Sequence, residues 1–163
     1  MNIRILEPKD VTQSYIDWML DKEVVKYSEN QYKLFTLEKQ KLYVQDCFFN
    51  KNIDLYGVFF NKEHIGNISL KDLSSPHKRA EITYLIGKKN YWNKGFGSRL
   101  VSIIVEKARE EYQLKKLYAG VAKENISSQK VLEKNNFKLE GIRQNHLFLN
   151  NVFMDQMDYG LIL

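Results

Sequence analysis

The sequence predicts a single α+β domain, and three observations support this class. Segments rich in β-branched and aromatic residues alternate along the chain with segments whose apolar residues recur at helical spacing. The predicted order of elements is β-α-α-β-β-β-α-β-α-β-β, so that consecutive strands in the middle of the chain form a meander. A length of 163 residues with 44% hydrophobic content is enough for one sizeable core.

The N-terminal third is predicted to contain a short strand and two helices. The strand covers residues 2–6, and Asp10 is a candidate N-cap for a helix over residues 11–21. Trp18 is the expected core anchor of that helix. Thr36, followed by an acidic residue in the first turn, predicts a second helix that runs to about residue 49.

The middle of the chain supplies the central strands and the next helix. Apolar runs at residues 55–60 and 64–70 are separated by three polar residues, which is the spacing of a hairpin. A loop at residues 74–79 precedes a strand over residues 80–86. A helix is expected from Gly97 to about residue 112.

The C-terminal third is predicted to add three strands and one helix. Residues 116–122 form a strand, and residues 125–137 form a helix with Asn125 or Ser127 at its N-cap. Two further strands lie on either side of a turn at Asn150 and Asn151: the first covers residues 138–143 and 146–150, and the second 152–163.

Composition excludes several classes of function. The formal charge is +5, but the lysines are spread along the chain among 20 acidic residues, so we expect a solvated surface and no nucleic-acid binding. Cys47 is expected to be a small core residue. The three histidines are too scattered for a metal site. Without a spanning apolar run or a signal segment, the expectation is a cytoplasmic protein that makes no membrane contact.

The most informative stretch is the strand, loop and helix start between Glu81 and Leu100. Gly95 and Gly97 lie where the loop becomes a helix, and Lys94 adds a positive charge. Free N–H groups in a first helical turn attract phosphate, although a Gly-x-Gly pair also occurs in ordinary tight turns. Leu100 excludes the dinucleotide-binding pattern Gly-x-Gly-x-x-Gly, and no Gly-Lys-Ser/Thr phosphate loop is present.

The segment Tyr91–Ser98, which reads Tyr-Trp-Asn-Lys-Gly-Phe-Gly-Ser, resembles the pyrophosphate-binding motif of the GNAT (Gcn5-related) acetyltransferases, Gln/Arg-x-x-Gly-x-Gly/Ala. Trp92 stands where the general motif has Gln or Arg. This departure is similar to the Rim-type branch of ribosomal-protein N-terminal acetyltransferases, where Trp-Gly-Lys-Gly-Tyr-Gly is common. In the family this loop binds through main-chain amides, so we expect the change of side chain to matter little.

A second motif follows in the order and at the separation that the family has. Asn125-x-x-Ser128-x-x-x-Leu132-x-Lys134-x-Asn136-Phe137 resembles Asn-x-x-Ala/Ser-x-x-x-Tyr/Leu-x-Lys-x-Gly-Phe. The tail after Glu140 is similar to the Rim and spermidine acetyltransferase branches. The resemblance implies the GNAT fold, a three-layer α/β/α sandwich whose mixed, mostly antiparallel sheet is splayed between strands 4 and 5. It also implies acetyl-CoA as the acetyl donor, no metal, and either a monomer or a homodimer.

In the family, acetyl-CoA contacts the end of the fourth strand, the glycine-containing loop and the start of the last helix. Carried over to this sequence, the expected cofactor-binding residues are Leu85, Ile86, Gly87, Trp92, Asn93, Lys94, Gly95, Phe96, Gly97, Ser98, Asn125, Ser128 and Lys130.

The route for protons is where the sequence departs from the family. Many members have a tyrosine that protonates the leaving thiolate at the position of Leu132. Glu81 is the candidate general base, since it begins the strand that carries the acetyl site, and a salt bridge with Lys78 or Arg79 is the alternative. Tyr159 is a candidate acid, with packing as an aromatic core residue as its alternative role.

The acceptor side is expected near the first two helices, where Trp18, Tyr27, Tyr32 and Phe35 supply aromatic surface and Glu29 a carboxylate. These aromatics could instead pack the helices onto the sheet. The resemblance implies direct attack of a primary amine on acetyl-CoA in a ternary complex, with a protein N-terminus, a polyamine or an amino sugar nucleotide as acceptor. A noncatalytic acyl-CoA-binding or regulatory domain is the alternative, because Leu132 replaces the usual acid.

Overall fold

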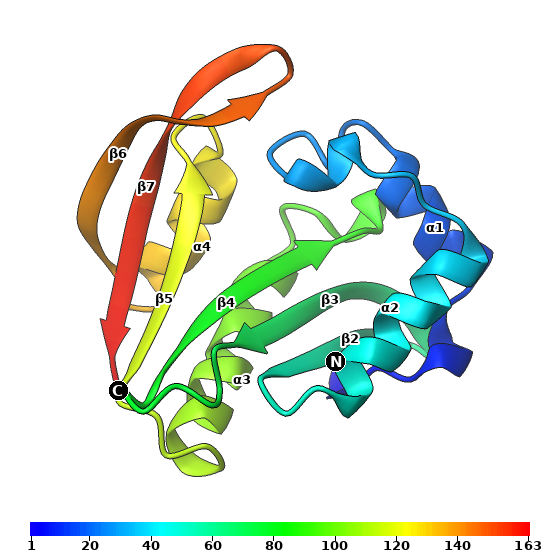
Figure 1. Ribbon diagram of the computed structural model, residues 1–163, viewed down its shortest axis with the longest axis horizontal. Coiled ribbons are helices and arrows are strands. Elements are labelled where there is room, and N and C mark those ends of the chain that lie inside the picture. Colours follow the sequence, from blue (N-terminus) through cyan, green and yellow to red (C-terminus); the bar gives the residue numbers. More distant parts are fainter.

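The chain forms one seven-stranded sheet with helices on both faces, and the computed structural model describes all residues 1–163 (Figure 1). The strand order is β1-β2-β3-β4-β5-β7-β6, and every neighbouring pair is antiparallel except β4 and β5. The strands are β1 (Asn2–Ile5), β2 (Ile53–Phe60), β3 (Glu63–Lys71), β4 (Arg79–Ile86), β5 (Lys116–Ala122), β6 (Lys138–Leu149) and β7 (Val152–Ile162). The helices are α1 (Gln13–Leu20), α2 (Leu37–Phe49), α3 (Phe96–Glu110) and α4 (Ile126–Lys134).

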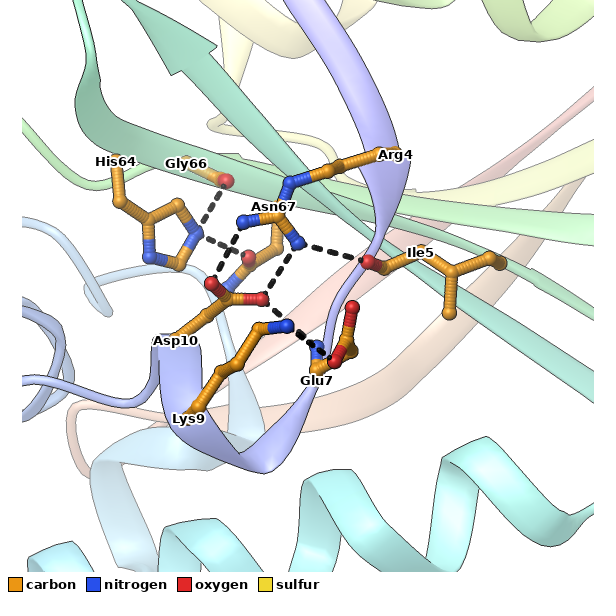
Figure 2. Close-up of polar contacts among 8 residues, drawn as sticks. All are labelled: Arg4, Ile5, Glu7, Lys9, Asp10, His64, Gly66 and Asn67. Carbon is orange, nitrogen blue, oxygen red and sulfur yellow. Dashed lines mark hydrogen bonds and ion pairs between the residues drawn. The ribbon is translucent and has the colours of Figure 1, made fainter.

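The predicted α+β class and element order are confirmed, with local differences. Residues 22–27 form turns after α1, and β6 runs without a break from Lys138 to Leu149. The prediction that Asp10 caps α1 is wrong, because Thr12 occupies that position. Asp10 instead accepts two hydrogen bonds from the Arg4 guanidinium, at 2.7 and 2.6 Å, and one from the backbone N–H of Glu7 (Figure 2).

Two apolar cores hold the layers together. The larger core lies between the sheet and α3, with Leu100 and Ile104 of the helix fully buried against strand residues such as Ile68 and Ile82. The smaller core joins α1 and α2 to β2 and contains Trp18 and Cys47, as predicted for both. Figure 1 shows α2 in front of the sheet and α3 behind it. The two cores therefore fix helices on opposite faces of the same sheet.

The sheet opens between β4 and β5. These strands pair only at Arg79 with Lys116, Ala80 with Leu117 and Glu81 with Tyr118. Beyond Glu81 the two strands diverge, as Figure 1 shows above the labelled C-terminus. On the side facing β5, the backbone groups of β4 from Ile82 onward have no strand partner. The opening is therefore the place where a ligand can reach both strands.

Candidate active site

The start of α3 lies beyond the wide end of the opening and presents free backbone N–H groups. The backbone N–H groups of Phe96, Gly97 and Ser98 have no backbone acceptor, because they belong to the first helical turn. Gly95 has φ +80° and nothing lies within 4 Å of where its Cβ would be, so the preceding loop is open to solvent. Free N–H groups and the positive end of the helix dipole favour a phosphate at this position.

Trp92 and Gly87 brace the loop that precedes α3. The indole Nε1 of Trp92 donates a hydrogen bond of 2.7 Å to the Ile86 carbonyl, which ties the loop back to the end of β4. A Cβ on Gly87 would overlap the indole ring of Trp18, and the Gly87 N–H already donates to Ile65. In this structure both residues fix the backbone between the end of β4 and the start of α3.

The first turn of α4 faces β4 across the opening. The Asn125 side chain accepts from the backbone N–H of Ser128 at 3.2 Å and caps the helix, as one of the two predicted caps. The Tyr84 hydroxyl of β4 lies 2.7 Å from Ser128 Oγ. Burial raises the pKa of Tyr84 to about 12, so this hydroxyl stays protonated at neutral pH. Sequence reasoning missed the Tyr84 hydroxyl as a functional group.

Glu81 is the last residue of β4 that pairs with β5, so it marks the narrow end of the opening. Its carboxylate forms no ion pair, and in particular none with Lys78 or Arg79. It is half-buried and lines a cavity of about 600 Å³ that extends from the opening toward α1 and α2. A carboxylate without a fixed partner is free to interact with a bound ligand.

The predicted acceptor residues divide between this cavity, its margin and the core. Tyr27, Glu29 and Phe35 line the cavity, whereas Trp18 is buried in the smaller core and does not. Tyr32 lies at the margin, where its hydroxyl donates a 2.6 Å hydrogen bond to the Phe148 carbonyl of β6. Only tertiary packing brings Tyr32 and Phe148 together.

The predicted acid Tyr159 lies away from the cavity. It is buried, and its hydroxyl donates to Glu133 Oε1 of α4 at 3.1 Å. Burial, followed by this carboxylate, raises the pKa of Tyr159. Leu132, at the position of the missing family tyrosine, is fully buried in the larger core.

The remaining predicted cofactor residues surround the start of α3 and α4. Leu85 lines the cavity, and Asn93, Lys94 and Lys130 are exposed. Neither Lys94 nor Lys130 is held in an ion pair, so both are available to an anionic ligand.

A polar stripe on β3 and β4 forms the floor of the cavity and was not predicted. Asn67, Ser69 and Lys71 lie on the same face of β3, and the Ser69 hydroxyl is 2.7 Å from the Thr83 hydroxyl of β4. Every second residue of an otherwise apolar strand is polar here, and this period-two alternation is the signal that would have revealed the stripe.

No group of three or more His, Cys, Asp or Glu side chains lies close enough together to hold a metal ion. The helices are all too short or too polar to span a membrane.

A family model described as an acetyltransferase (GNAT) domain matches residues 1–138. The chain belongs to the GNAT acetyltransferase family. The predicted family and fold are thereby confirmed, and the opening between β4 and β5 is the splay that the resemblance implied.

Relatives of this GNAT chain occur in Bacillus subtilis. The uncharacterized N-acetyltransferase YnaD is 30% identical over 167 residues, which cover 98% of this chain and 92% of YnaD. The uncharacterized N-acetyltransferase YoaA is 32% identical over 101 residues. That second match covers 62% of this chain and little more than half, 56%, of YoaA.

Solved structures share this GNAT fold over nearly the whole chain. A spermidine N-acetyltransferase from Vibrio cholerae, in complex with CoA and spermine, superposes with a TM-score of 0.87 at 19% identity, covering 99% of this chain and 94% of that one. RimL, a ribosomal L7/L12 α-N-protein acetyltransferase in complex with CoA, gives a TM-score of 0.87 at 20% identity. The superposition covers 99% of this chain and 93% of RimL. At this identity the likeness concerns the fold alone.

Proposed function

We propose that this chain is an acetyl-CoA-dependent N-acetyltransferase that moves an acetyl group to a primary amine by direct attack in a ternary complex. One observation carries the proposal: a single opening in the sheet leads from the free N–H groups of α3 to a cavity that holds the unpaired Glu81 carboxylate. The first feature suits a pyrophosphate and the second suits an amine. Both would then meet at the same opening.

The donor side fits acetyl-CoA in two respects. The first turn of α3 offers N–H groups to a diphosphate, with Lys94 and Lys130 exposed nearby and unpaired. The β5-facing edge of β4 offers unpaired backbone groups to the amides of a pantetheine arm. Acetyl-CoA supplies an activated thioester, so the protein's task is to position it, stabilise negative charge on its carbonyl oxygen and move protons.

Glu81 is proposed to take the proton that the amine loses as its nitrogen bonds to the acetyl carbon, directly or through a water molecule. The C–S bond then breaks, and the thiolate takes a proton or leaves as such. The Tyr84 hydroxyl, joined to Ser128 Oγ at 2.7 Å, is proposed as the source of that proton. Tyr84 would then take the role of the tyrosine that many family members have at the position of Leu132.

The decisive experiment is to measure release of CoA from acetyl-CoA with a panel of primary amines. Turnover on any amine, with the acetylated product identified by mass spectrometry, supports the proposal. Binding of acetyl-CoA without turnover on any amine would instead favour a noncatalytic acyl-CoA-binding domain. The observation favouring that second candidate is the buried Leu132.

A further inference from the structure

The charged groups around the cavity have no partners within the protein. Five charged side chains line it, namely Glu29, Lys33, Lys39, Lys71 and Glu81. None of the five takes part in an ion pair, although nine ion pairs occur elsewhere in the molecule. The cavity therefore presents more positive than negative charge to whatever enters it.

Among the three lysines that line the cavity, Lys71 is the one that lies on the sheet and is half-buried. It is the last residue of β3, lies opposite Glu81 of β4, and is half-buried, whereas Lys33 and Lys39 are exposed at the α1–α2 side. Residues directly opposite each other in an antiparallel pair point to the same face, so the Lys71 ammonium and the Glu81 carboxylate lie on one wall of the cavity without forming an ion pair. A half-buried ammonium gains from an anionic partner more than an exposed one does.

The rest of the buried polar lining is neutral. Gln40 donates to the Tyr15 hydroxyl at 3.0 Å, and Asn67 accepts from His64 at 2.8 Å. All of these groups suit hydroxyl or amide partners and none offers a second carboxylate. A polycation such as a polyamine would meet three lysines and only two separated glutamates.

We infer that the acceptor is a small primary amine that also carries an anionic group, a phosphate or a carboxylate, held by Lys71 with support from Lys39. This inference rests on the proposed function and names the substrate class of the same site. The amine would face Glu81 while the anion faces the neighbouring lysine, which orients the acceptor in the cavity. The neutral polar floor would bind the uncharged part between them.

The test compares matched acceptors that differ only in the anion. Glucosamine 6-phosphate is measured against glucosamine, and alanyl-aspartate amide against alanyl-asparagine amide, with spermidine as the cationic probe. We expect kcat/KM to be about tenfold higher for the anionic member of one pair, as one charge-assisted contact provides. The pair that shows the preference identifies phosphate or carboxylate. No preference in either pair, or a preference for spermidine, overturns the inference.

Variants assign the preference to its residue. Lys71→Gln should reduce the anionic preference to about twofold or less, and Lys134→Gln, exposed on α4 outside the cavity, should leave it unchanged. If Lys71 acts only on the reactivity of Glu81, Lys71→Gln lowers kcat/KM equally for both members of a pair. The ratio of the two kcat/KM values then stays the same, which contradicts our assignment. Should Lys71→Gln not fold, the exposed Lys39→Gln is the second variant and should lower the same ratio partially.

A binding measurement separates this inference from the proposed function. With CoA present, glucosamine 6-phosphate or the aspartyl dipeptide should raise the melting temperature more than its neutral partner does, and Lys71→Gln should remove the difference. If that holds while no amine is acetylated, the anion site stands and the proposed reaction fails. If neutral and anionic amines are acetylated equally well, the reaction stands and the anion site fails.

Discussion

Glu81 combines three properties that favour a role with a bound ligand. It is the last residue of β4 that pairs with β5 before the strands diverge, it is half-buried, and it has no ion-pair partner. Its neighbour across the sheet is Lys71, a cation that is also unpaired. A structural carboxylate would be expected to use a neighbouring cation, so the absence of a pair favours a role with ligand.

Glu81→Gln is therefore expected to lower kcat by roughly a hundredfold while acetyl-CoA affinity changes by no more than a few fold. The change is nearly isosteric and removes only the ability to accept a proton. Steady-state kinetics between pH 6 and 9 and acetyl-CoA titrations measure the two quantities. Unchanged activity across that range would make Glu81 structural and leave the proton to water.

His64 is a half-buried histidine whose surroundings disfavour its protonated form. Its Nε2 donates to Gly66 O at 3.0 Å and Asn67 Oδ1 at 2.8 Å, while Nδ1 is buried without a partner (Figure 2). The ring stacks on Phe59 and meets Trp18 edge-on. Protonation would place a charge and an unpaired N–H in this apolar setting, and burial accordingly lowers the pKa of His64.

Because the folded-state pKa of His64 lies below 6.5, the unfolded chain binds the proton first as pH falls. The free energy of unfolding should therefore decrease below about pH 6.5, by at most about 1.4 kcal/mol per pH unit for one proton. Urea unfolding between pH 7.5 and 5.5 measures this slope. His64→Gln should flatten it, and His77→Gln, in an exposed loop, should not. Equal slopes in all three proteins would exclude His64 as the cause.

At the scale of elements, the β6–β7 hairpin and the segment before α2 close over the margin of the cavity. Three hydrogen bonds join them: Tyr32 to Phe148 O, the Asn150 N–H to Gln31, and the Asn150 side chain to Lys26 O. The partners come from opposite sides of the splay. This contact bridges the two sides of the splay, so we expect it to shape the route by which the proposed acceptor enters.

Tyr32→Phe keeps the ring and removes one of these bonds, worth about 1 kcal/mol. We expect the acceptor KM to rise by up to about fivefold and the acetyl-CoA KM to stay constant, since the proposed cofactor residues lie at the starts of α3 and α4. Tyr32→Ala combined with Glu29→Gln should enlarge the same effect. A proportional change in both KM values would show that the hairpin contact does not belong to the acceptor site.

At the scale of the whole molecule, the ligand is expected to hold the two halves of the splayed sheet together. Acetyl-CoA that binds only the folded state stabilises it by about 2.7 kcal/mol at one hundred times Kd. For a chain of this size each kcal/mol raises the melting temperature by about 2–4 °C. Thermal unfolding with and without acetyl-CoA measures the shift.

Gly97→Glu should abolish that shift by placing a carboxylate among the free N–H groups of α3. Gly97→Ala is the matched control, because a Cβ there would lie 3.4 Å from Val131 Cγ2, an ordinary contact. The alanine variant should keep the shift. A folded glutamate variant that still binds acetyl-CoA normally would mean that the phosphate site lies elsewhere.

The sequence by itself determined those features that depend on neighbours along the chain. Strand and helix periodicity predicted the element order, and Gly95 predicted the turn before α3, because its positive φ is a local property of the backbone. The Asn125 cap was predictable for the same reason, since it bonds a residue three positions away. The family motifs are likewise continuous segments.

Only the tertiary structure decided which side chains face the same space. From the sequence, Trp18 could have lined a pocket or packed in the core. In the structure its ring packs in the smaller core, against Gly87 from a distant part of the chain. Lys71 and Glu81 are on different strands, and the register of β3 with β4 sets them side by side. Tyr32 reaches Phe148, 116 positions away. Propensity and spacing act over a few residues, whereas the charge and shape of the acceptor cavity arise from strand register and packing between distant segments.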